Sequence, residues 1–127
     1  TMGVTFKSVE VELDLVAGVM AVTVSGRLEK EDYETFNKEF DSMLSVRDRI
    51  RVLVELKDFH GWTAGAAWED TKMGVRHYSD IERLAIVGEN KWQKGMAMFV
   101  KPFTRAEVRY FDASDAEAAH AWITAED

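Results

Sequence analysis

The residues whose side chains could carry out chemistry gather in one stretch, residues 58–65, which reads DFHGWTAG. His60 beside Asp58 could act as a general base, because an imidazole titrates near neutral pH and a carboxylate can orient it. No serine or threonine is identifiable as its nucleophile partner, and a turn histidine bonded to the backbone is the simpler explanation. We therefore expect a non-catalytic protein, with a hydrolase or isomerase built on His60 and Asp58 as the weaker alternative.

Thr63 stands where a helix is predicted to begin. Its hydroxyl can cap that helix by accepting a backbone N–H two or three residues on, which is worth about 1 kcal/mol. Gly61 and Gly65 suit turn geometry and close packing of the helix start. Alternatively, the N–H groups of Thr63, Ala64 and Gly65 offer a small anion-binding nest. A phosphate loop is not indicated, since the Gly-Lys-Ser/Thr ending is absent.

Large apolar side chains are concentrated on the second and third predicted helices. Aromatic and methionine residues at helical spacing are usually core residues. Their excess here suggests in addition that, if the two helices splay, the gap between them is an apolar pocket, and methionine adapts readily to varied ligands. The candidate walls of this ligand-binding pocket are Trp62, Trp68, Trp92, Met96 and Phe99.

Basic residues are concentrated between residues 91 and 109, in a chain that is acidic as a whole. They are Lys91, Lys94, Lys101, Arg105 and Arg109. A solvated helix end accounts for them. The alternative is a basic rim beside the pocket, which would meet a lipid headgroup, a membrane surface or an acidic partner.

Composition narrows the function classes. The 127 residues fit one domain, residues 1–127, and the net charge of −7 argues against nucleic-acid binding. There is no cysteine, and the histidines His60, His77 and His120 lack the i, i+4 spacing that could chelate zinc. We expect no metal and no cofactor. The charged N-terminal stretch does not fit a signal peptide and no apolar run could span a membrane, so we expect a soluble, cytoplasmic protein.

The elements that would position these residues follow from hydrophobic periodicity. Strict alternation from Val9 to Leu15 predicts a strand with one solvated face, and a reversal at Ala17-Gly18 leads into its hairpin partner. Residues 33–44 show helical spacing after an acidic first turn, Glu29 to Asp32. The remaining predicted segments are strands at Val19–Val24, Ile50–Leu56, Leu84–Gly88 and Glu107–Phe111, and helices opening at Thr63, Asn90 and Ser114. For the last two helices, Asn90 with Gln93 and Ser114 with Glu117 are predicted capping boxes.

The resulting order is β-β-α-β-α-β-α-β-α. An opening hairpin followed by three β-α steps predicts an α/β fold, with a five-stranded mixed sheet and four helices.

This order, together with the runs LVELKDFHGWT, ERLAIVGENKW and VRYFDASDAEAAHAWI, resembles the SpoIIAA-like superfold of STAS and CRAL-TRIO domains. The chain looks most like the small bacterial SpoIIAA-like proteins of largely unassigned function, and the similarity extends from about Val9 to Ile123. The resemblance implies a fold more strongly than an activity. In STAS antagonists a serine at the start of the second helix is phosphorylated by a partner kinase. Here that serine signature is missing, and Thr63 is the hydroxyl that would take its place.

Two functional hypotheses follow. The first is a non-catalytic SpoIIAA-like domain that binds a small apolar or amphipathic, lipid-like ligand between the second and third helices. The second is a STAS-type regulatory module that docks a protein partner around Thr63. Peripheral membrane contact through the basic rim and a homodimer formed through an edge strand or an exposed tryptophan are compatible with either.

Overall fold

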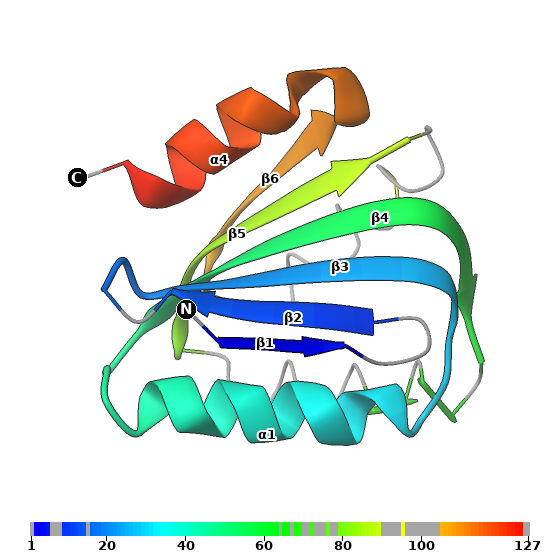
Figure 1. The fold of residues 1–127 in the computed structure, drawn as a ribbon, viewed down its shortest axis with the longest axis horizontal. Helices are drawn as coiled ribbons and strands as arrows, with labels where there is room; N and C mark the ends of the chain where they lie inside the picture. Colours follow the sequence, from blue (N-terminus) through cyan, green and yellow to red (C-terminus); the bar gives the residue numbers. More distant parts are fainter. Residues whose placement is uncertain are drawn as a thin grey trace.

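A computed structural model describes residues 2–5, 9–14, 16–63, 65–66, 68–69, 72, 76, 79–89, 95 and 105–125. Six strands form one sheet in the order β1-β2-β3-β4-β5-β6, so neighbours in the chain are neighbours in the sheet (Figure 1). The elements are β1 (Met2–Thr5), β2 (Val9–Asp14), β3 (Val19–Leu28), α1 (Asp32–Leu44), β4 (Ile50–Trp62), β5 (Ile81–Gly88), β6 (Glu107–Asp112), the 3-10 helix η2 (Ala113–Asp115) and α4 (Ala116–Thr124).

The opening hairpin is present as predicted. β2 and β3 are antiparallel, with Asp14 opposite Val19 at the turn. The Asp14 carboxylate accepts the backbone N–H groups of Val16 (3.1 Å) and Ala17 (3.0 Å), and Gly18 takes a positive φ of 70° that closes the reversal. β1 pairs with the outer edge of β2 and adds a sixth strand to the five predicted. Its four residues were too few to show a strand period.

The second half of the sheet is parallel. β3, β4, β5 and β6 all run in the same direction, and α1 makes the crossover from β3 to β4. The predicted α/β fold with a mixed sheet, parallel beyond the hairpin, is therefore confirmed. The strand bounds differ from the prediction mainly in three strands. β3 continues past Val24 to Leu28, β4 continues past Leu56 to Trp62, and β5 begins at Ile81 instead of Leu84.

Helices α1 and α4 lie on opposite sides of the sheet (Figure 1). α1 buries Tyr33, Phe36, Phe40 and Met43 against one face, and α4 buries Ala119 and Ile123 against the other. Because side chains alternate along a strand, consecutive residues of β4 serve the two cores: Val52 packs with the α1 cluster and Leu53 with the α4 cluster. The nearly continuous apolar run in β4 reflects this burial on both faces.

Of the four predicted helices, α1 and α4 are the two described as continuous elements. The predicted helices after Thr63 and after Asn90, with the Asn90–Gln93 cap, lie largely outside the described residues, although the described residues 65, 66, 68, 69, 72, 76 and 95 are helical. No helix in the described part of the chain has the length and apolar character required to cross a bilayer.

The predicted Ser114–Glu117 capping box is wrong. Ser114 lies inside η2, and α4 begins after Asp115 with no side-chain cap. A 3-10 turn tightens the entry into the helix instead, as it does at many helix ends. At α1, Glu29 donates its backbone N–H to the Asp32 carboxylate (2.7 Å), so this part of the acidic cluster has a structural role.

Polar side chains of the central strands fasten α4 to the sheet. Arg51 of β4 donates to the carbonyl oxygens of Ile123 (3.0 Å) and Ala125, and Arg83 of β5 donates to those of Trp122 (2.8 Å) and Ala125 (3.1 Å). These bonds satisfy carbonyls that the end of a helix leaves without partners.

The packing of β4 generates a stability prediction. Leu53→Ala should lower the free energy of unfolding by about 2–5 kcal/mol, because it leaves a cavity in the α4 core. Val46→Ala is the control: Val46 is exposed, and its truncation should cost no more than about 0.5 kcal/mol. Urea unfolding followed by circular dichroism measures both. Equal midpoints for the two variants would contradict the assignment of Leu53 to the core.

Candidate functional site

The candidate site lies at the carboxyl end of β4. The sequence suggested a tight turn after Leu56, but the strand continues through residues 57–62. Its pairing with β3 is irregular there: Lys57 pairs with Ser25, Phe59 with Gly26 and Gly61 with Arg27. The predicted turn is therefore a bulged strand end, since the two extra residues, 58 and 60, have no partners in the register.

The bulge depends on unusual backbone geometry. Gly61 has φ 114° and Gly26 has φ 70°, both in the region that favours glycine. Asp58 has φ 49°, which aspartate tolerates better than most residues, and its N–H donates to the Glu89 carboxylate (2.7 Å). Bulges re-aim the following chain. Here the bulge changes the direction of the backbone just before Thr63.

Thr63 has the capping role that its type predicts. Its Oγ1 accepts the backbone N–H of Ala66 at 3.1 Å, and the residue is half-buried. Ala66 is fully buried in the core beneath α1, and Gly65 lies close enough to Lys30 for a Cβ to make ordinary contact at 3.4 Å. The start of this helical segment is thus held firmly against the body of the domain. Ala64, the middle residue of the predicted anion nest, lies outside the described residues.

Trp68 is the member of the predicted pocket wall whose side chain is described, and 63% of its surface is exposed. It follows the anchored Ala66 by two residues, so its indole is presented from a fixed base. The side chain of Trp62 and all of Trp92, Met96 and Phe99 lie outside the described residues. The predicted pocket between the second and third helices therefore lies largely outside the described residues.

The other predicted site residues are dispersed. Lys91, Lys94 and Lys101 of the basic rim lie outside the described residues, while Arg105 is exposed. Arg109 lies over the Trp122 ring, 5.0 Å from its centroid, and so packs on α4. Asp58 is exposed, and the side chain of His60 lies outside the described residues. Within the described ranges, no three acidic or histidine side chains come together as metal ligands would.

A second group of polar residues, which no motif in the sequence marks, lies at the opposite end of the sheet. Arg47, Arg49 and Arg51 occupy alternate positions from the segment after α1 into the start of β4, and they line a surface depression there. The signal in the sequence was the run RDRIR at residues 47–51. Without the fold, nothing indicated that the β2–β3 turn and the end of α4 would meet it.

Gly61 provides a direct test of the bulged strand end. Gly61→Ala should cost about 1–3 kcal/mol of unfolding free energy, because φ 114° is strained for a residue with a side chain even though the space around it is open. Gly65→Ala, in a helical position, should be neutral or stabilising by up to about 1 kcal/mol. Thermal unfolding compares the two, and a Gly61→Ala protein as stable as Gly65→Ala would refute the bulge geometry.

Comparison with known proteins gives matches to a family model and to solved structures. A sequence model described as SpoIIAA-like matches residues 19–124. Among solved structures, this chain is similar to an uncharacterized protein of the DUF3478 family with a SpoIIAA-like fold from Shewanella loihica PV-4. That similarity has a TM-score of 0.77 and 26% sequence identity, and covers 97% of this chain and 99% of the other. No curated protein matches.

Proposed function

Since this chain belongs to the SpoIIAA-like family, we propose that it is a non-catalytic binding domain for a small apolar or amphipathic, lipid-like ligand. The ligand would lie between the helical segments that follow Thr63 and Asn90, with Trp68 as one wall. The exposed indole of Trp68 is the observation that carries the proposal.

Two features of the surroundings support this role for Trp68. The segment is anchored, because Thr63 caps its start and Ala66 is buried in the α1 core. In addition, Arg76 donates to Asp41 of α1 at 3.4 Å, which adds a second tie between the segment and the domain. A large aromatic group held on a fixed base and left open to solvent offers apolar area to a ligand at little conformational cost.

Binding of oleate tests the proposal. Native mass spectrometry of the protein with oleate below its aggregation threshold should show a one-to-one complex, and isothermal titration should give its affinity. Trp68→Ala should weaken binding at least about tenfold, which is roughly 1.4 kcal/mol.

The matched control for this experiment is Trp122→Phe. Trp122 packs against Phe111 on the α4 side of the sheet, so phenylalanine there should leave oleate affinity unchanged. Absence of an oleate complex with the wild-type protein, or equal affinities for Trp68→Ala and Trp122→Phe, would overturn the proposal.

A second candidate is a STAS-type regulatory module that docks a protein partner around Thr63. It is favoured by the half-buried position of Thr63 at a helix start, where an added phosphate would meet the positive end of the helix dipole. Such a change in charge would alter a docking surface without unfolding the domain.

The partner hypothesis makes its own prediction. A partner captured by the wild-type protein, identified and purified, should bind Thr63→Ser with unchanged affinity, because serine retains the capping hydroxyl. Thr63→Glu should reduce that affinity at least about tenfold, measured by isothermal titration. A partner that binds all three proteins equally would exclude docking around Thr63.

A further inference from the structure

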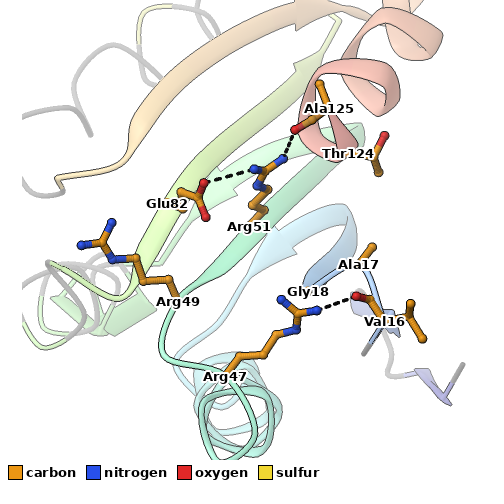
Figure 2. A pocket seen from close by; sticks show the side chains of 9 residues that line it. All are labelled: Val16, Ala17, Gly18, Arg47, Arg49, Arg51, Glu82, Thr124 and Ala125. Carbon is orange, nitrogen blue, oxygen red and sulfur yellow. Dashed lines mark hydrogen bonds and ion pairs between the residues drawn. The ribbon is translucent and has the colours of Figure 1, made fainter. Parts of the chain in front are cut away.

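The depression at the amino ends of β4 and β5 lies at the opposite end of the sheet from Thr63. It has a volume of about 370 Å³ and is formed by the β2–β3 turn, the segment between α1 and β4, the start of β5 and the end of α4. Figure 2 shows the residues that line it: Val16, Ala17, Gly18, Arg47, Arg49, Arg51, Glu82, Thr124 and Ala125.

The charge of this lining is opposite to that of the chain. Three arginines and one glutamate give it a formal charge of +2 (three positive charges minus one), whereas the whole chain carries −7. Asp48, between two of the arginines in sequence, is not part of the lining. Local positive charge in an acidic protein attracts anions specifically to this surface.

Arg51 supplies a fixed positive charge at the base of the depression. Its side chain is only 14% exposed, and its guanidinium contacts Glu82 (3.1 Å) and the carbonyls of Ile123 and Ala125. These contacts hold the group in one orientation. Its ion-pair partner Glu82 is 33% exposed to solvent.

Arg47 lies beside the β2–β3 turn, on the side of the depression opposite Arg51. Its Nη2 donates to the Val16 carbonyl oxygen, a bond drawn in Figure 2. The guanidinium lies directly against Gly18, where a Cβ would come within 2.6 Å of Arg47 Nη1. Two features therefore favour glycine at position 18: the turn requires a positive φ of 70°, and the arginine leaves no room for a side chain.

Arg49 differs from Arg47 and Arg51 in its contacts with the described part of the chain. It is exposed and makes no hydrogen bond or ion pair with the described residues. In Figure 2 its side chain extends away from Arg47 and Arg51. Exposed side chains change rotamer within nanoseconds, so the guanidinium can swing toward a bound anion at small cost.

We propose that this depression binds an oxyanion of the phosphate type, with Arg49 as the movable bidentate donor and Arg47 and Arg51 as positioned positive charges. A guanidinium presents two parallel N–H groups that match two oxygens of a phosphate, and the bonds are strengthened by charge. The site is separate from the proposed lipid-like ligand site and does not depend on it.

Inorganic phosphate is the probe for the test. Titration at low ionic strength, followed by NMR of the backbone amides, should give saturable shifts at residues 16–18, 47–51 and 124–125. Arg49→Gln should weaken phosphate binding at least about tenfold, because it removes a charged donor of two parallel hydrogen bonds. Its fold should be unaffected, since Arg49 contributes no bond to the described structure.

Arg27→Gln is the matched control, since Arg27 is exposed at the carboxyl end of β3 and the substitution removes the same charge. It should leave phosphate affinity within about twofold of the wild type, since a single distant surface charge is strongly screened. Absence of saturable shifts in the wild-type protein, or equal weakening by Arg49→Gln and Arg27→Gln, would overturn the proposal.

A second arm identifies the source of the phosphate group. Flotation with phosphatidylcholine vesicles, with and without phosphatidic acid, tests whether a lipid headgroup fills the site. Arg49-dependent recruitment to the phosphatidic acid vesicles would assign a headgroup, and phosphate binding without recruitment would assign a soluble phosphate compound. Recruitment that Arg49→Gln does not reduce, in a protein that gives no phosphate shifts, would reject the site.

Discussion

Burial of β4 on both faces is the constraint on which the rest of the structure depends. Val52 belongs to the core under α1, and Leu53 belongs to the core under α4. The strand thereby contributes to both apolar layers, and its neighbours β3 and β5 pair with it in parallel. Since a strand buried on both sides cannot slip by one residue without exposing one set and misplacing the other, the register of the central sheet is firmly set.

The two ends of β4 differ in how the strand connects to its neighbours. At the carboxyl end, the regular pairing of β4 with β3 is interrupted by two extra residues in β4. Glycines at positive φ accommodate these residues before the helical segment begins at Thr63. At the amino end the polar side chain of Arg51 enters the α4 side of the sheet and binds the final carbonyls of the helix. Both candidate sites are therefore consequences of how this strand terminates.

Polar residues within the apolar strand face α4. Arg51 and Glu55 share a face with Leu53 because they lie two residues to either side of it. Arg51 binds the end of α4, and Glu55 pairs with His120 at 3.1 Å on the same helix. These contacts, together with Arg83 and Arg109 over Trp122, give α4 a polar attachment that supplements its short apolar stripe of Ala119 and Ile123.

The sequence by itself determined the chain order of five of the strands, the hairpin, the mixed sheet and the capping hydroxyl of Thr63, because periodicity and capping are local properties. Only the tertiary structure decided that the stretch after Leu56 is a bulged strand, because this depends on pairing with Gly26 in β3. Tertiary structure also brought Arg47 against Gly18 and Arg51 against Ala125. The members of these two pairs are separated in the chain by 29 and 74 positions, respectively. A local sequence pattern cannot predict which distant part of the backbone will approach a given side chain.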